Sequence, residues 1–160
     1  MWNSTPDLSK MPAKIPEYTE DRIHMKLLMF NTHEFWFRTF KNSLNEDNDE
    51  DIEKTVENSL VIFIHIEEND IERKERLVKK ATDNITWLAK KTGRKRVVLH
   101  SFAHLSDSKS ESTGAQDIFL ALQEKLISRG LDTTMTPFGY LNEFRIQVLG
   151  DSLAKVWKSL

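Results

Sequence analysis

The segment from Ser59 to Ile66 (SLVIFIHI) constrains the fold of this 160-residue chain more than any other part of it. It is nearly continuously apolar and rich in β-branched residues, which is typical of a strand buried on both faces. Such a strand belongs at the centre of a sheet that helices cover. Other strand-like and helix-like segments follow it along the chain. The sequence therefore predicts an α/β or α+β domain with a mixed sheet.

Two amphipathic segments predict the main helices. Asn69 or Asp70 can cap the first, which ends before Gly93, and the second runs from Thr113 to Arg129 before Gly130. One face of the first helix is apolar and is expected to pack on the sheet. Its residues are Ile71, Val78, Ala81, Ile85, Leu88 and Ala89.

Further strands are predicted on both sides of this region. Met25–Phe30 and Glu34–Phe40 are predicted to form a hairpin around the polar residues 31–33, and Arg96–Phe102 and Glu143–Leu149 to form single strands. These segments supply the remaining strands of the mixed sheet.

The connections are assigned from their turn residues and charges. A turn is predicted over Met135–Tyr140 and a short helix over Ser152–Leu160, after Gly150. The acid-rich run Asn45–Asp51 is predicted to be a solvated connection. A metal-binding loop is the lesser alternative, because the run lacks the glycine turn and oxygen spacing of a Ca²⁺ loop.

Composition limits the classes of function that fit. The absence of cysteine excludes a disulfide scaffold and a cysteine nucleophile, and it fits a reducing compartment. No apolar run approaches the roughly 20 residues of a membrane helix, and the N-terminus lacks the apolar core of a secretory signal. The net charge of −2 argues against general coating of nucleic acid. We therefore expect a cytoplasmic protein without a membrane partner.

The chain divides into a tail and one domain. Residues 1–23 hold three of the four prolines and show no helical or alternating period, so they are predicted to be poorly ordered or extended. Residues 24–160 are expected to form the single folded domain.

Common catalytic and cofactor signatures are absent. The chain has no G-x-S-x-G, no glycine-rich phosphate loop and no H-E-x-x-H. His100 and His104 straddle the end of a strand, where four residues separate side chains by roughly 13 Å, so they are poorly placed for one metal ion. Neither a metal nor an organic cofactor is expected.

Two loops carry the strongest functional signal. Ser101–Ser106 (SFAHLS) follows a buried strand, where open sheets present their ligand crevices. Pro137–Tyr140 (PFGY) combines a fixed φ, a glycine and two aromatic rings, so its backbone could approach a ligand closely. Either loop taken alone could be a purely structural turn.

Together these loops resemble the N-terminal editing domain of archaeal-type threonyl-tRNA synthetases. The order SFAHLS, amphipathic helix, PFGY, strand and LGDSLAK is similar to that family, and MKLLMFNTHE and LVIFIHIE resemble its opening and central strands. The resemblance covers residues 25 to about 157. It implies a fold like that of D-aminoacyl-tRNA deacylases, a homodimer, and hydrolysis of seryl-tRNA made in error for threonine.

The resemblance also implies a set of site residues. His104 would lie near the reacting ester or hold its loop, and bulk beside the substrate's β-carbon would exclude threonine. The pocket walls would be Ile66, Phe102, Ala103, Pro137, Phe138, Gly139 and Tyr140.

Two positions depart from the family pattern. Asn142 stands where the family has a lysine, and Lys155 stands where it has a glutamate. Asn142 keeps the ability to hydrogen-bond but not the charge, and Lys155 puts a cation where an anion could have received the substrate's ammonium group. These two residues are the remaining catalytic candidates, and they leave the preferred substrate open.

The polar face of the first helix is a candidate tRNA contact. An ordinary solvated helix face is the alternative, although an exposed tryptophan among cations is unusual there. The candidates are Arg73, Arg76, Lys80, Trp87, Lys90 and Arg94.

The leading hypothesis is an aminoacyl-tRNA deacylase that acts in trans on mischarged tRNA, most simply Ser-tRNA(Thr). A domain that binds an aminoacyl-tRNA end, a nucleotide or an amino acid without turnover is the rival. An assistant to a separate threonyl-tRNA synthetase is a third possibility. The changes at Asn142 and Lys155 favour the rival, and the paired loops favour the enzyme.

Overall fold

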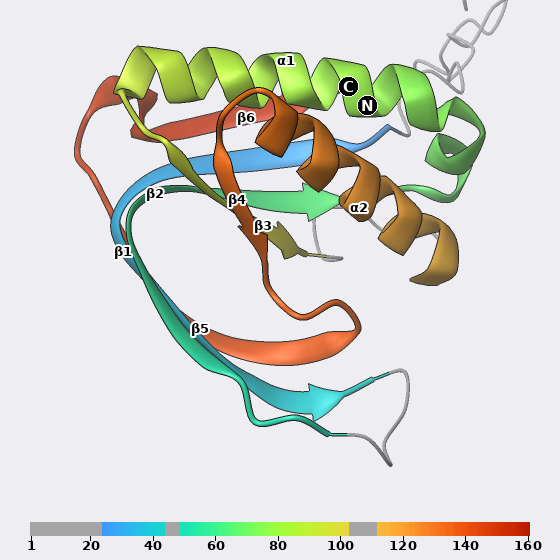
Figure 1. Ribbon diagram of the computed structural model, residues 1–160, viewed down its shortest axis with the longest axis horizontal. Helices are drawn as coiled ribbons and strands as arrows, with labels where there is room; N and C mark the ends of the chain where they lie inside the picture. Colours follow the sequence, from blue (N-terminus) through green and yellow to red (C-terminus); the bar gives the residue numbers. More distant parts are fainter. Residues whose placement is uncertain (1–23, 44–48, 103–111) are drawn as a thin grey trace, which may run out of the picture.

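The computed structural model describes residues 24–43, 49–102 and 112–160 (Figure 1). Within these residues a six-stranded sheet has the order β4-β3-β2-β1-β5, and β6 also pairs with β1. The strands are β1 (Lys26–Asn42), β2 (Glu53–His65), β3 (Arg96–Ser101), β4 (Asp132–Met135), β5 (Tyr140–Val148) and β6 (Lys155–Ser159). The helices are α1 (Lys74–Thr92) and α2 (Ser112–Ser128), and 3-10 turns span Glu68–Arg73 and Ser152–Ala154.

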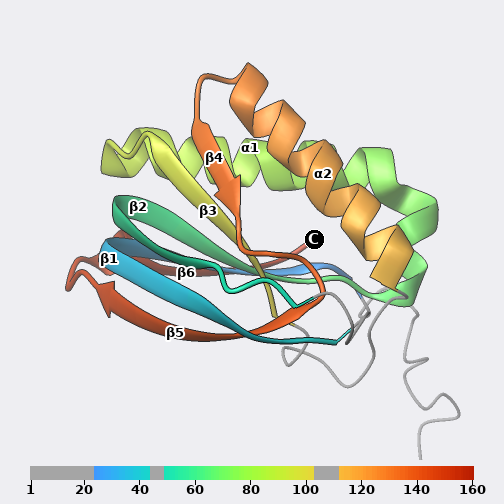
Figure 2. The ribbon, with the colours of Figure 1, turned by 60° about the horizontal axis from the view of Figure 1, so that its bottom comes forward.

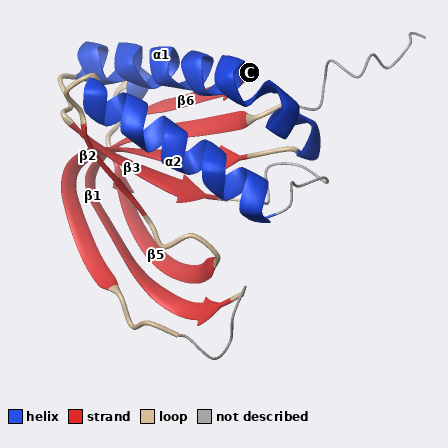
Figure 3. Ribbon diagram, turned by 45° about the vertical axis from the view of Figure 1, so that its right-hand side comes forward, coloured by secondary structure: helices blue, strands red, loops and turns tan. Residues whose placement is uncertain are grey.

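The sheet is mixed, as predicted. β2, β3 and β4 are parallel to one another, whereas β1 is antiparallel to β2, β5 and β6. Both helices lie on one face of the sheet (Figure 3). The segment Ser59–Ile66 lies in the centre, and α1 ends at Gly93, whose φ of 68° is the left-handed value that favours glycine. The α+β class, the central strand and the two main helices are therefore confirmed, although the predicted caps Asn69 and Asp70 lie in the 3-10 turn and α1 begins only at Lys74.

The hairpin prediction for residues 25–40 is wrong, because β1 is one continuous strand. The three polar residues suggested a turn, but the structure satisfies them inside the sheet. The hydroxyl of buried Thr32 donates to the carbonyl oxygen of Ser59 at 2.9 Å. Arg94 Nε donates to Asn31 Oδ1 at 2.6 Å. The exposed His33 follows at a register shift between β1 and β5.

β1 and β2 change face together at this point. Leu27 and Met29 belong to the core beneath the helices, whereas Phe35 and Phe37 belong to a second core on the other face. Opposite His33, Asn58 has a φ of 51°, and β2 shows the same change of face. Figure 1 shows both strands bending strongly, so that β5 lies beneath the upper part of the sheet.

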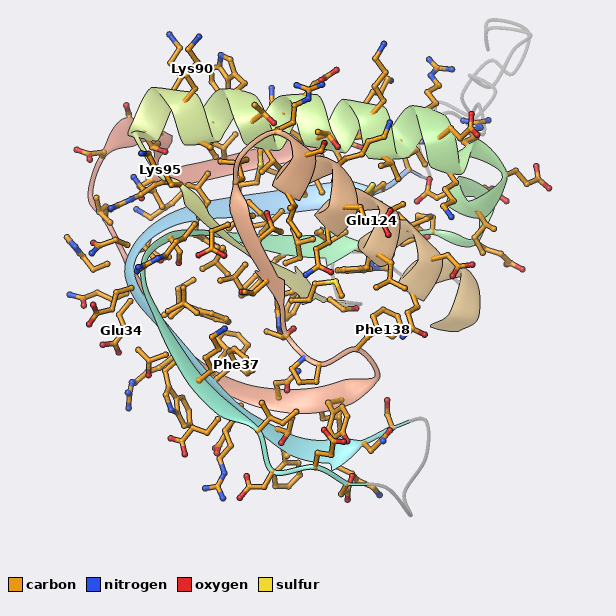
Figure 4. The ribbon with its side chains drawn as sticks, in the orientation of Figure 1. Glu34, Phe37, Lys90, Lys95, Glu124 and Phe138 are labelled. Carbon is orange, nitrogen blue, oxygen red and sulfur yellow. The ribbon has the colours of Figure 1, made fainter. Side chains whose placement is uncertain are left out.

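Two cores result from this bend. The first lies between the upper sheet and the helices (Figure 2) and holds most of the predicted inner face of α1, although Ile71 is 36% exposed. The second fills the curl of the sheet, where Phe37 points inward and Glu34 points outward (Figure 4). Its buried members are Phe35, Phe37, Val56, Val61, Phe63 and Val98.

The prediction of a C-terminal helix is also wrong over most of its length. Only Ser152–Ala154 form a single 3-10 turn, and residues 155–159 form β6. In the upper part of β1, β2 pairs with one edge of the strand and leaves the other edge open. β6 pairs with that open edge, from Lys26↔Ser159 to Phe30↔Lys155. Val156 packs against the first core while Trp157 is exposed, which is the alternation of a strand.

Thr32 offers a test of the continuous strand. Thr32→Val keeps the volume but leaves the Ser59 hydroxyl without its partner, so the free energy of unfolding should fall by about 1–2 kcal/mol. Urea unfolding measures this, with His33→Val at the exposed neighbour as the control that changes it by less than about 0.5 kcal/mol. A neutral Thr32→Val would contradict the strand and favour a surface turn.

Candidate functional site

The three parallel strands bring the predicted loops to one edge of the sheet. β2, β3 and β4 run in the same direction, so their carboxyl ends lie together. The N–H of Phe102, just after β3, donates to the carbonyl oxygen of Ile64 in β2 at 2.9 Å. The N–H of Thr136, just after β4, donates to a carbonyl oxygen of β3 at 3.0 Å. Ile66, Phe102 and the turn 137–140 therefore lie at the same edge (Figure 1).

The turn at Pro137–Tyr140 is tied to the lower part of the sheet. Gly139 has a φ of 81°, and its carbonyl oxygen accepts from the N–H of Ser43 at 2.7 Å and from the Ser43 hydroxyl at 2.5 Å. The Tyr140 hydroxyl accepts from the N–H of Glu50 at 3.0 Å. These bonds join β5 to the end of β1 and the start of β2, so the turn has a fixed place above the curl.

Three predicted wall residues are anchored in the cores. Ile66 is 5% exposed and belongs to the first core. The Phe138 ring lies 5.5 Å from the Phe119 ring of α2 (Figure 4), and the Phe102 ring lies 5.1 Å from the Phe63 ring in the curl. Ile66 and Phe138 pack on the helix side of the sheet, and Phe102 packs in the curl. Contacts on both sides of the sheet therefore hold these residues in place at its edge.

A buried hydrogen bond joins the bases of the two candidate loops. His100 Nδ1 lies 2.9 Å from Thr136 Oγ1, so the end of β3 is bonded to the residue before Pro137. His100 is 4% exposed and packs against Phe63 at 4.9 Å between ring centroids. Burial lowers the pKa of His100 from 6.5 to about 4, so the ring is neutral near pH 7.

Sequence reasoning did not single out Thr136, and it considered His100 only as a metal ligand. One signal was present. Along β3 and the residue after it, His100 alternates with Val98 and Phe102, so all three belong on the same face as the aromatic core.

The turn that carries Ile66 is held by buried charges. Lys26 Nζ lies 3.0 Å from Glu67 Oε1, and the Glu67 side chain is fully buried. The N–H of Glu67 donates to Asp70 Oδ2 at 2.7 Å. Burial raises the pKa of Asp70 above its ordinary value. Buried contacts of Lys26, Glu67 and Asp70 therefore set the direction in which the chain leaves β2 and enters the 3-10 turn.

The family resemblance also points to four residues that fall in different places: Asn142, Lys155, Ala103 and His104. Asn142 lies on β5 opposite Thr39; its Oδ1 is buried without a hydrogen-bond partner among the described residues, and its Nδ2 donates to the Tyr140 carbonyl oxygen at 3.3 Å. Lys155 is exposed on β6, opposite Phe30.

Asn142 and Lys155 are therefore nine residues apart along β1, on the order of 30 Å of strand length. The structure does not pair these two positions within one chain. Ala103 and His104 lie outside the described residues.

The described residues offer no group of three metal-ligating side chains, and none of their helices is long and apolar enough to cross a membrane. A cavity of about 360 Å³ lies at the opposite end of the sheet from the candidate loops. It is lined by Lys54–Glu57 of β2 and by the starts of β3 and β4 at Arg96 and Asp132. No predicted site residue lines it.

The sequence of the chain decides its family. The pattern of the Archaea-specific editing domain of threonyl-tRNA synthetase matches residues 25–160. The chain belongs to this editing-domain family. The described strands and helices all fall inside the matched region.

Relatives of this editing domain are parts of much longer proteins. A threonine–tRNA ligase of Hyperthermus butylicus is 30% identical in an alignment over 140 residues that covers 82% of this chain and 22% of the ligase. The ligase of Thermofilum pendens is 26% identical over 138 residues, 85% of this chain and 22% of the ligase. The chain therefore spans about a fifth of the ligases it matches.

Solved structures share the fold at low identity. A probable eukaryotic D-amino acid tRNA deacylase has a TM-score of 0.56 at 9% identity and covers 85% of this chain and 99% of its own. The c-Myc DNA unwinding element binding protein has a TM-score of 0.60 at 12% identity, with 84% and 98% covered. The predicted deacylase-like fold is confirmed by these likenesses.

The neutral His100 predicts how stability depends on pH. Its pKa in the folded state lies below its unfolded value of 6.5, so the stability that it supports above pH 6.5 is lost as the pH falls toward 4. The full difference corresponds to about 3 kcal/mol. Between pH 7 and pH 4.5, the parent should therefore lose about 2–3 kcal/mol more of its unfolding free energy than His100→Phe, measured by urea unfolding. Equal losses in the two proteins would show that His100 does not titrate in this way.

Proposed function

We propose that this chain is an aminoacyl-tRNA deacylase that hydrolyses mischarged tRNA, with Ser-tRNA(Thr) as its substrate. The observation that carries the proposal is the meeting of the turn 137–140 with the carboxyl ends of β2 and β3, in a chain of the editing-domain family. An edge of this kind is where open sheets with parallel strands bind ligands.

The chemistry of translation explains why such an activity is needed. Serine is threonine without a methyl group, and one methyl group distinguishes ligands by only roughly 1–3 kcal/mol in a binding pocket. A second site that admits the smaller product and hydrolyses it supplies the missing discrimination. In the proposal, packed residues at the edge, including Phe102 and Tyr140, restrict the room beside the substrate's β-carbon.

Ester hydrolysis of this kind needs an oriented water, donors for the developing oxyanion and a closed pocket, but no nucleophilic side chain. The main chain of the loops that contain Ala103 and Gly139 is proposed to supply donors, with His104 near the ester. Within the described part of the chain, Asn142 Oδ1 is a buried acceptor without a partner, which is costly unless another group donates to it. We assign to Asn142 a hydrogen bond from the substrate's ammonium group or from a bound water.

The wider setting forms part of the same proposal. The deacylase would act in trans in the cytoplasm, as a homodimer, on tRNA released by a separate threonyl-tRNA synthetase. Lys155 lies on β6 away from Asn142, so the proposal gives it no contact with a substrate bound at the same chain's loops.

A second candidate is an editing-like domain that binds an aminoacyl-tRNA end without turnover. Asn142 and Lys155 favour it, because they replace the charged lysine and glutamate of the family pattern. A non-hydrolysable seryl-adenosine analogue should raise the melting temperature under either proposal. Binding of the analogue without hydrolysis of any aminoacyl-tRNA would support this second candidate.

The primary test is deacylation of a panel of charged tRNAs. The protein should release serine from Ser-tRNA(Thr) faster than threonine from Thr-tRNA(Thr), because the pocket excludes the extra methyl group. Radiolabelled amino acids measure the release. Rates at the uncatalysed background for every aminoacyl-tRNA would overturn the proposed activity.

Substitutions at the site test catalysis by the main chain. Ala103→Phe fills the proposed pocket and should lower kcat/KM for Ser-tRNA(Thr) by at least roughly a hundredfold, whereas Asn142→Ala removes one hydrogen bond and should lower it roughly tenfold. Gln147→Ala removes an exposed amide from the same strand and should leave the rate unchanged. A larger loss for Asn142→Ala than for Ala103→Phe would contradict the assignment.

A further inference from the structure

The outward face of α1 concentrates positive charge in a chain that is acidic overall. Between residues 71 and 96 the chain has ten lysines and arginines and three acids, whereas the whole chain has a net charge of −2. The rest of the molecule is therefore strongly negative. A surface that is merely solvated more often mixes the two signs and pairs them along the helix.

The cations of this face are not neutralised. Arg73, Arg76, Lys80 and Lys90 are exposed, and none forms an ion pair within residues 24–43, 49–102 and 112–160. After Glu75, Asp83 is the one acid of α1, and its carboxylate lies 3.3 Å from the guanidinium of Arg129, just after α2. The described residues thus leave the charge of this face available to a partner.

An aromatic ring lies among these cations. Trp87 is 46% exposed and comes between Lys80 and Lys90 on the same side of the helix. A flat, exposed ring beside unpaired cations suits nucleic acid, because bases stack on the ring while phosphates meet the charges. Figure 4 shows Lys90 pointing outward from α1.

Arg94 differs from the other predicted contacts. It is half-buried, and its Nε donates to Asn31 Oδ1 at the bend of β1. We therefore define the α1 cationic face without it, as Arg73, Arg76, Lys80, Trp87 and Lys90.

The position of this face fits a long polyanion whose end lies at the candidate site. Arg73 comes seven residues after Ile66, so α1 starts at the edge where the candidate loops meet, and it extends about 28 Å from there. The acidic residues Asp49, Glu50 and Asp51 lie by the turn 137–140, where the N–H of Glu50 donates to the Tyr140 hydroxyl at 3.0 Å. The attraction of a polyanion therefore comes from α1 and not from the side of the turn.

We propose that the α1 cationic face binds the phosphate backbone of tRNA while the aminoacyl end occupies the candidate site. This inference rests on the proposed function for the choice of tRNA as the polyanion. It assigns binding of the tRNA body to a helix on the opposite face of the sheet from the aromatic core of the curl.

The test measures binding of unacylated tRNA(Thr) by fluorescence anisotropy over a range of salt concentrations. The double variant Lys80→Gln/Lys90→Gln should raise Kd roughly tenfold at 0.1 M salt and reduce the salt slope by about two, because each lost phosphate contact lowers the slope by about one. The matched control Lys54→Gln/Lys125→Gln removes the same charge from β2 and α2 and should change Kd less than about twofold.

Trp87→Ala gives an independent readout. It should raise Kd at least about fivefold without changing the salt slope, since stacking is not ionic. Circular dichroism and melting curves check that the variants, which change exposed side chains, still fold.

Each outcome decides the inference. Equal weakening by the double variant and its control would show attraction by net charge alone and would overturn it. Binding to vesicles that contain phosphatidylserine, without binding to tRNA, would overturn it in favour of a membrane contact. Because unacylated tRNA needs no turnover, binding that depends on α1 without any deacylation would uphold this inference while overturning the proposed enzyme.

Discussion

The shared bend of β1 and β2 at His33 and Asn58 is the constraint on which the rest of the structure depends. At this point both strands exchange their inward and outward faces while keeping one register with each other. Above the bend, alternate residues face the helices and the curl, and below it the buried residues face the curl. One sheet can therefore build two cores, one with α1 and α2 and one within its own curl.

The bend also places the candidate site. It carries the lower ends of β1 and β2 round to the edge where β3 and β4 finish, so that Ser43 and Glu50 can bond to the turn at Gly139 and Tyr140. The His100–Thr136 bond connects the same turn to β3 from the other side. The site region thus depends on contacts between segments that are up to 96 residues apart. Such contacts fix the main chain more firmly than the local turn sequence could.

The sequence predicted the features that local patterns determine. The buried run at Ser59–Ile66, the apolar stripe of α1 and the stop at Gly93 each follow from residues that lie close together in the chain. The meeting of the two candidate loops was implied only by the family resemblance, because β4, which brings the turn 137–140 to the end of β3, was not among the predicted strands. The other predictions required only periodicity and glycine conformation.

The features that were missed depend on distant partners. Asn31 and Thr32 look like turn residues, but Arg94 and Ser59 satisfy them within β1. Residues 155–159 become a strand because β1 offers them an open side. Asn142 shows the same limit in the site. Its residue type suggests only a polar contact, and it is the fold around it that buries Oδ1 without a partner among residues 24–43, 49–102 and 112–160.

The charges of the chain suggest how binding is divided between the pocket and the tRNA body. Asn142 stands where the family pattern has a lysine, which removes a positive charge from the site and weakens what the pocket can contribute through charge. Attraction of phosphates to α1 would supply binding energy from a part of the substrate that does not react. Binding energy of that origin holds the ester at the loops without distinguishing serine from threonine. The shape of the pocket would then carry the discrimination, and the unpaired cations of α1 would carry the affinity.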